Sequence, residues 1–209
     1  MSYTPVRPDS PVLAPAPDDR ATAIAQLRHA VIAPGAEAAR AETLAFVEAH
    51  PDALVRSGPI GHVTGSAIVL DPVTRRVLLL HHAKLNRWLQ PGGHADGDGN
   101  LAAVAWREVT EETGLGDLVV VMPAIDVDIH RIPARGDEPT HLHFDVRFLL
   151  LATGDVEPDL NHEATGFRWV DAHAPEIADD TEFGRVVGQA RIGFDAVREQ
   201  LSSRPAAGT

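Results

Sequence analysis

The chain has 209 residues, enough for one domain with a sizeable core plus extensions. It contains no cysteine, which excludes disulfides, thiolate metal sites and cysteine nucleophiles. The formal net charge of -12 argues against nucleic acid as a partner, because phosphate binding needs a basic surface.

The first 56 residues predict a lead-in followed by two helices. Residues 1–20 are rich in proline among small and acidic residues, a composition typical of a disordered segment. Apolar residues at helical spacing then predict a helix that Pro34-Gly35 breaks, and a second helix that ends before Pro51. We expect residues 21–56 to form a helical N-terminal appendage whose role is packing or homodimer formation.

The rest of the chain predicts one domain, residues 57–201, before a loose tail at 202–209. Strands are expected at 62–71, 76–82, 118–122, 125–132, 140–152 and 166–170, with a turn at 133–139. Helices are expected at about 100–113, with Gly114 at the C-cap, and at 182–201. No apolar run could span a bilayer and no secretion signal is recognisable, so we expect a cytoplasmic protein without a membrane partner.

Three glutamates lie close together on the helix expected at about 100–113. Glu108, Glu111 and Glu112 stand at i, i+3 and i+4, so they share one helix face. Like charges at this spacing destabilise a helix unless they are neutralised, and Mg²⁺ or Mn²⁺ prefers such oxygen ligands. A solvated acidic face is the alternative, but the spacing favours a metal site.

The stretch from Gly93 to Leu115 resembles the signature box of the Nudix hydrolases. Every fixed position of the box matches except one, because Gly99 stands where the family has an isolated Glu. The matching positions include Arg107, Glu108, Glu111, Glu112 and Gly114. The resemblance implies the α/β class, as an α/β/α sandwich with a mixed sheet.

The resemblance also implies a role for each residue of the box. Glu108, Glu111 and Glu112 would bind a divalent metal, Mg²⁺ or Mn²⁺, with the Gly92 carbonyl as a further oxygen ligand. Arg107 would hold these carboxylates in register by a bidentate ion pair. The metal would polarise phosphoryl oxygens and activate a water that attacks phosphorus. The catalytic residues implied are Glu111, Glu112 and Arg107.

Glu163 is the last catalytic candidate, because many family members place an additional Glu in a late loop. It would act as general base or as a further ligand, and its alternative is a solvated loop acid. The departure at Gly99 leaves one carboxylate missing, which Asp96 or Asp98 could supply from the flexible stretch just before it. The alternative for both is loop solvation. If one of them has taken over, Gly99→Glu is expected to restore a variant that lacks it.

Two further groups are candidates for substrate binding. His141, His143 and Asp145 alternate along one expected strand, so they point to one face. We expect this face beside the box helix, with substrate hydrogen bonding favoured over transition-metal binding and a structural role as the alternative. Lys84 and Arg87 precede the box and are expected to meet phosphate or a base.

The leading function is divalent-metal-dependent hydrolysis of a diphosphate linkage in a nucleoside diphosphate derivative or related nucleotide. An isopentenyl diphosphate isomerase shares the fold, but that branch relies on a cysteine. A nucleotide-binding module with weakened catalysis is the second rival, which Gly99 favours and the intact box acids oppose. The tyrosine that marks diadenosine polyphosphate hydrolases is absent, because Tyr3 is the only tyrosine.

Overall fold

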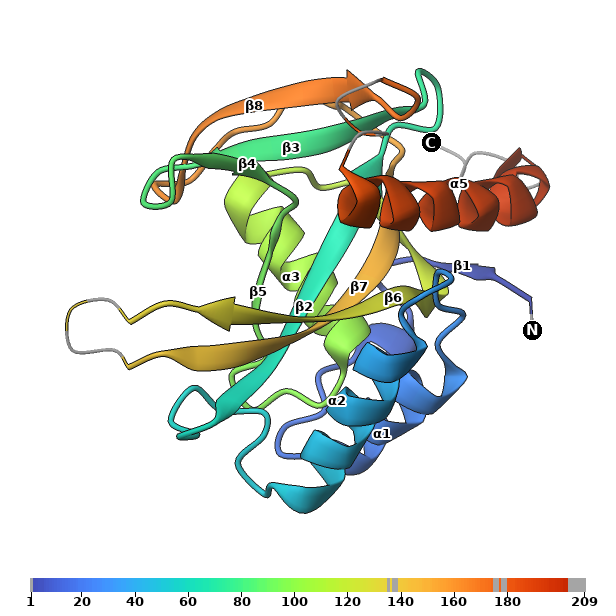
Figure 1. Ribbon diagram of the computed structural model, residues 1–209. Coiled ribbons are helices and arrows are strands. Elements are labelled where there is room, and N and C mark those ends of the chain that lie inside the picture. Colours follow the sequence, from blue (N-terminus) through green and yellow to red (C-terminus); the bar gives the residue numbers. More distant parts are fainter. Residues whose placement is uncertain (1, 135, 137–138, 175–176, 178–179, 203–209) are drawn as a thin grey trace.

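The computed structural model describes residues 2–134, 136, 139–174, 177 and 180–202, and its centre is a mixed sheet (Figure 1). The eight strands are β1 (Thr4–Val6), β2 (Gly61–Leu70), β3 (Arg76–His82), β4 (Arg87–Leu89), β5 (Gly92–His94), β6 (Leu118–Ile132), β7 (His141–Ala152) and β8 (Ala164–Asp171). The helices are the short 3-10 helix η1 (Pro11–Leu13), α1 (Arg20–His29), α2 (Glu37–Ala49), α3 (Leu101–Thr113) and α5 (Thr181–Ser202).

Strand β2 is buried along its whole length and organises the sheet. It pairs in parallel with β7 and antiparallel with β3 and β5, within the order β1-β6-β7-β2-β3-β4. Strand β8 adds to β3.

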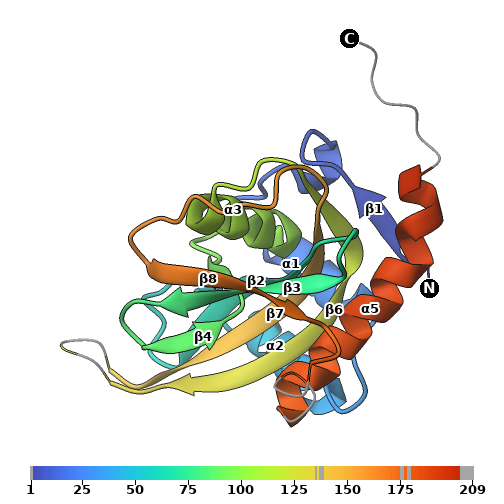
Figure 2. The same cartoon turned by 90° about the horizontal axis from the view of Figure 1, so that it is seen from above.

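Successive side chains along each strand alternate between the two faces of the sheet, so the buried residues form two cores. The α3-side core contains Val69 and Phe148 together with residues of α1, α2 and α3. The α5-side core contains Ile68 and Leu149 together with residues of α5. Figure 2 shows α3 and α5 on opposite sides of the sheet, so the predicted α/β/α sandwich is confirmed.

Helix α3 carries the predicted motif and begins and ends close to the expected residues. At its start, the Asn100 side chain accepts a hydrogen bond from the Ala103 backbone N–H (3.3 Å). At its end, Gly114 adopts a left-handed φ of 67°, as the C-cap prediction requires. Leu101 and Val104 are fully buried in the α3-side core, which leaves the opposite side of the helix for polar residues.

The prediction of a disordered lead-in at 1–20 is wrong for the part of that segment that the structure describes. Strand β1 pairs antiparallel with β6. The Asp98 carboxylate accepts a hydrogen bond from the Ala16 N–H (2.8 Å), and the Asn100 side-chain amide donates one to the Ala14 carbonyl oxygen (2.8 Å). The prolines fit this arrangement because edge strands and helix starts need no N–H from them.

Helices α1 and α2 form the expected helical N-terminal appendage, and they pack against the sheet. Leu27 of α1 and Val47 of α2 are fully buried in the α3-side core. The Phe46 ring stacks on the Phe144 ring of β7, with ring centroids 4.0 Å apart. Packing is therefore a role that these helices do fill, and the homodimer stays a prediction.

The remaining strand and helix predictions lie within two residues of the observed elements, with one exception. The strands expected at 118–122 and 125–132 form the single strand β6, whose pairing with β7 is irregular between Val121 and Asp126. The expected turn at 133–139 lies partly outside the described residues, as does the tail after Ser202. Among the described helices, none is long and apolar enough to cross a membrane, and the cytoplasmic location stays a prediction.

Gly99, the position that departs from the Nudix box, lies directly under the N-terminal segment. Its N–H donates a hydrogen bond to the Ala16 carbonyl oxygen (2.8 Å). A Cβ added at Gly99 would lie 1.9 Å from the Asp19 carbonyl oxygen, which is backbone and cannot swing aside. The side chain of a Glu could not occupy this space, so the expectation that Gly99→Glu restores a damaged variant is withdrawn.

We predict that Gly99→Ala destabilises the fold by about 1–3 kcal/mol, the usual cost of forcing extra atoms into a packed site. Urea unfolding at equilibrium would measure the loss. Gly188→Ala in α5 is the matched control, because its added Cβ would meet no atom within 4 Å and alanine favours a helix. Equal stability of the two variants would contradict the role given to the N-terminal segment.

Candidate active site

A polar pocket of about 270 Å³ lies where α3 meets the segment before β8. Its lining residues are Arg56, Asp96, Arg107, Glu108, Glu111, Glu112, Asn161 and Glu163. Backbone hydrogen bonds fix the segment to the end of α3, from Asp159 N–H to the Thr113 carbonyl oxygen (2.8 Å) and from Asn161 N–H to that of Glu112 (3.3 Å). Figure 2 shows the segment beside α3. The pocket thus brings Glu163 to the helix glutamates.

The backbone of β5 lies directly against the carboxylates of α3. The Gly92 N–H donates a hydrogen bond to Glu112 Oε2 (3.0 Å). A Cβ added at Gly93 would lie 2.1 Å from Glu108 Oε2, so only glycine allows this approach. Gly93 therefore lets the Glu108 carboxylate approach the backbone of β5, and Gly92 supplies the N–H that binds Glu112.

Arg107 orients one of these carboxylates and ties it to β5. Its Nη2 donates hydrogen bonds to Glu108 Oε1 and to the His94 carbonyl oxygen, both at 2.8 Å. Its Nε lies 4.0 Å from Glu111 Oε1. The ion pair with Glu108 therefore uses one carboxylate oxygen, where the resemblance implied a bidentate pair.

Negative charge on Glu112 is disfavoured in this pocket. Burial raises the pKa of Glu112 to about 8, although the Gly92 hydrogen bond opposes the shift. The negative charges of Glu108, Glu163 and Glu111 raise this pKa further, and burial also raises the pKa of Glu108. A hard divalent cation would supply the missing positive charge, and these oxygen donors fit Mg²⁺ or Mn²⁺.

The two aspartates expected to replace the missing Glu have different surroundings. Asp96 lines the pocket, but its two oxygens accept hydrogen bonds from Arg56 Nε (2.7 Å) and Nη2 (2.8 Å), which lowers the pKa of Asp96. Asp98 does not line the pocket. Its Oδ1 accepts hydrogen bonds from the Ala16 and Asn100 N–H groups, both at 2.8 Å, so it anchors the N-terminal segment to the start of α3.

Two lining residues, Arg56 and Asn161, were missed by the sequence analysis. Arg56 lies in the turn region between α2 and β2, and its partner Asp96 is 40 positions away. A single arginine so far along the chain from its partner produces no local sequence pattern. Asn161 stands two residues before Glu163, so its place in the same loop was the one available signal.

Two hydrogen bonds hold the main chain of Glu163 in place. Its carbonyl oxygen accepts a hydrogen bond from the Ala83 N–H, and its own N–H donates one to Asn161 Oδ1, both at 2.8 Å. Lys84 and Arg87 lie in the exposed β3–β4 hairpin that begins beside Ala83, and neither of them lines the pocket. Their role in substrate binding stays a prediction.

His141, His143 and Asp145 share one face of β7, but that face is not the one beside α3. Phe144 and Val146, which alternate with them, belong to the α3-side core. The three polar side chains therefore point to the opposite side of the sheet. The expectation that they lie beside the box helix is wrong, because strand periodicity predicts which residues share a face and not which helix covers it.

Asp145 is a buried acceptor for several side chains. It accepts hydrogen bonds from Thr64 Oγ1 (2.8 Å), Ser66 Oγ (2.6 Å) and Arg147 Nε (3.1 Å). The hydrogen bonds from Thr64 and Ser66 join β2 to β7 across their parallel pairing. On the same face, burial and the neighbouring histidines lower the pKa of His143 to about 2, so its ring is neutral.

Comparison with known proteins agrees with this geometry. The sequence matches the family model of the NUDIX domain over residues 61–188. Among solved structures, a C. elegans Ap4A hydrolase binary complex is 20% identical with a TM-score of 0.50, covering 62% of this chain and 95% of that one. An E. coli dihydroneopterin triphosphate pyrophosphohydrolase is 19% identical with a TM-score of 0.49, covering 61% and 92%. No curated protein matches. The Ap4A hydrolase likeness shows a common fold.

The pKa of Glu112 predicts how stability changes with pH in metal-free protein. Its folded-state pKa of about 8 lies above the ordinary 4.5, so the folded state binds more protons between those values. The stability of the wild type relative to Glu112→Gln should therefore fall as pH rises from about 5 to 8. Urea unfolding in EDTA would measure this difference, with Glu42→Gln on the exposed side of α2 as control. A difference that stays constant with pH would contradict the prediction.

Proposed function

The chain belongs to the Nudix family, and we propose that this pyrophosphohydrolase cleaves a diphosphate linkage in a nucleoside diphosphate derivative or related nucleotide, with the help of a divalent metal. The observation that carries the proposal is the pocket in which Glu108, Glu111 and Glu112 of α3 meet Glu163 from a distant loop. Apart from Arg56, Arg107 is the one cation that the described lining supplies beside the four glutamates, and a divalent metal would add the positive charge that this density of acids favours.

The residues present fit Mg²⁺ or Mn²⁺. Glu108, Glu111 and Glu112 would hold the metal through carboxylate oxygens, and the Gly92 carbonyl is a further candidate ligand. When bound, such a cation polarises phosphoryl oxygens and lowers the pKa of a coordinated water. Arg107 would keep Glu108 in position through its hydrogen bond.

Glu163 is proposed as the general base. Its side chain lines the pocket opposite α3, and its main chain is fixed by Ala83 and Asn161. A carboxylate placed there can take a proton from the attacking water while the new P–O bond forms and the bridging P–O bond breaks. Arg56 and Arg107 are the two cationic residues of the lining set, and their charges favour the departing phosphate group.

We predict that Glu111→Gln and Glu112→Gln each lower turnover at least about a hundredfold, as loss of charge stabilisation at a reacting phosphoryl group commonly does. Phosphate-containing products would be measured with Mg²⁺ and Mn²⁺ on nucleoside triphosphates, dinucleotides and sugar nucleotides. Glu42→Gln is the control with the same chemical change on an exposed helix. Wild-type rates in both pocket variants would contradict the metal assignment.

The same panel separates an enzyme from a binding module. An enzyme releases product from at least one nucleotide when Mg²⁺ or Mn²⁺ is added, and EDTA stops it. Tight nucleotide binding without turnover in either metal would favour the module with weakened catalysis.

The loop acids give a further prediction. Glu163→Gln should lower kcat strongly while the free energy of unfolding stays near that of the wild type, because its side chain serves the pocket. Asp98→Asn should lower the free energy of unfolding by about 1 kcal/mol, because it weakens two hydrogen bonds of the N-terminal segment. Kinetics and urea unfolding on both variants would measure this, and the reverse pattern would overturn both assignments.

A further inference from the structure

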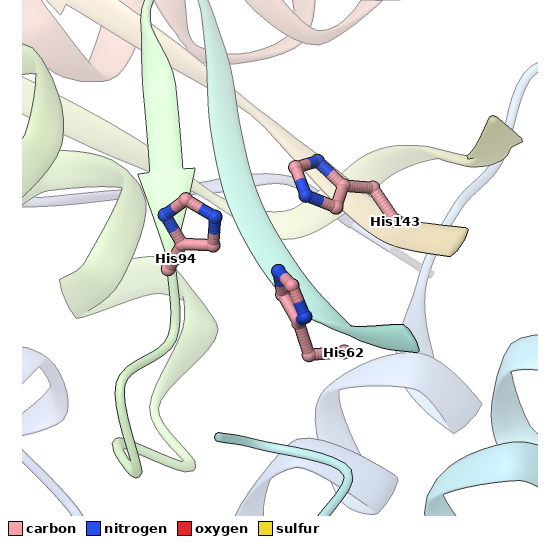
Figure 3. Close-up of side chains that lie close together, drawn as sticks. All are labelled: His62, His94 and His143. Atoms are coloured by element: carbon pink, nitrogen blue, oxygen red, sulfur yellow. The ribbon is translucent and has the colours of Figure 1, made fainter. Parts of the chain in front are cut away.

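A cluster of histidines lies on the face of the sheet away from α3. His62, His94 and His143 come from β2, β5 and β7, and each offers a ring nitrogen within 4.8 Å of the others. Figure 3 shows the three rings converging from their separate strands. We propose that His62, His94 and His143 form a binding site for Zn²⁺ or a similar divalent transition metal, separate from the carboxylate pocket.

Strand pairing explains why residues so distant in sequence meet. In the parallel pairing of β2 with β7, His62 is the direct partner of His143. In the antiparallel pairing of β2 with β5, His94 stands opposite Thr64, which shares a face with His62. Three backbone segments therefore fix the three rings from different directions, as a preorganised metal site requires.

The ring distances match this convergence. The ring centroid of His62 lies 4.7 Å from that of His143 and 4.9 Å from that of His94, and the His94 and His143 centroids are 5.2 Å apart. His62 is buried, and the other two rings are half-buried. The group is thus shielded by the fold but reachable by an ion.

The donor chemistry selects a different metal from the one expected in the carboxylate pocket. Neutral imidazole nitrogens suit zinc, copper and nickel, whereas Mg²⁺ prefers carboxylate, carbonyl and water oxygens. Three histidines that leave a fourth position open are one of the arrangements that proteins use for zinc. The pattern along β7 alone favoured substrate hydrogen bonding for His143, and its two partners from β2 and β5 favour metal binding instead.

Neighbouring groups orient the cluster, as outer partners of metal ligands commonly do. His141 Nδ1 lies 2.9 Å from the Pro139 carbonyl oxygen, and its Nε2 lies 3.2 Å from His143 Nε2. The His130 ring lies 5.3 Å from the His143 ring and is itself held by Asp128 (2.9 Å). Two neighbouring histidine rings therefore pack against His143.

The test uses the full chain, stripped of metal and then titrated with Co²⁺ and Zn²⁺ in excess Mg²⁺, so that the carboxylate pocket is saturated. We expect the visible absorption of low-coordinate Co²⁺, a single tight Zn²⁺ in calorimetry and a rise in Tm on Zn²⁺ binding. A wild-type protein that shows neither the absorption nor Zn²⁺ binding would overturn the proposal, whatever the variants do.

Variants locate the site. His94→Asn and His143→Asn should each weaken Zn²⁺ binding at least about tenfold, with circular dichroism confirming that they fold. His29→Asn on the exposed end of α1 removes a distant histidine, and Glu112→Gln removes a carboxylate of the pocket. Both of these should bind Zn²⁺ like the wild type. If Glu112→Gln loses Zn²⁺ and the histidine variants keep it, the ion belongs to the carboxylate pocket and the proposal fails, while the proposed hydrolysis would stand.

Discussion

The parallel pairing of β2 with β7 determines which side chains of these two strands face α3 and which face the opposite side of the sheet. The two strands stay in register from Gly61↔Leu142 to Leu70↔Leu151. Since both alternate together, their apolar positions on one side form the floor on which α3 packs, and the polar positions on the other side meet one another. A shift of one residue would exchange the two faces. The apolar floor under α3 and the pairing of His62 with His143 both follow from this one register.

A buried network of ion pairs lies on the face of the sheet opposite α3 and joins β6 and β7 to α5. Arg147 of β7 is buried and contacts Asp126, Asp128, Asp145 and Glu182 at 3.1 Å each, and Arg185 of α5 also contacts Asp126. These acids raise the pKa of Arg147, so it stays charged. Removing Arg147 would leave buried carboxylates short of positive charge, which is far more costly than the net value of an ion pair. The network therefore fixes the start of α5 against the polar half of the sheet.

Local signals in the sequence were sufficient to predict helix α3 and the face that its glutamates share. The reason is that helix caps and i, i+4 spacing depend on residues only a few positions apart. They were insufficient for the N-terminal segment, whose order depends on Asp98 and Asn100 some 80 positions away. Arg56 was missed for the same reason. Alternation identified the polar side of β7 correctly, but the helix that covers each face is decided by the connection between strands. Long-range contacts thus account for each of these differences.

The lining of the carboxylate pocket carries more negative than positive charge. It holds five carboxylates and two guanidinium groups. Arg56 pairs with Asp96, and Arg107 pairs with Glu108 and lies 4.0 Å from Glu111, so the five carboxylates share two cations. A diphosphate brought into this pocket alone would meet net negative charge at short range, where repulsion is strong because water is partly excluded. The proposed hydrolysis would therefore require a divalent cation to bind before or together with the substrate.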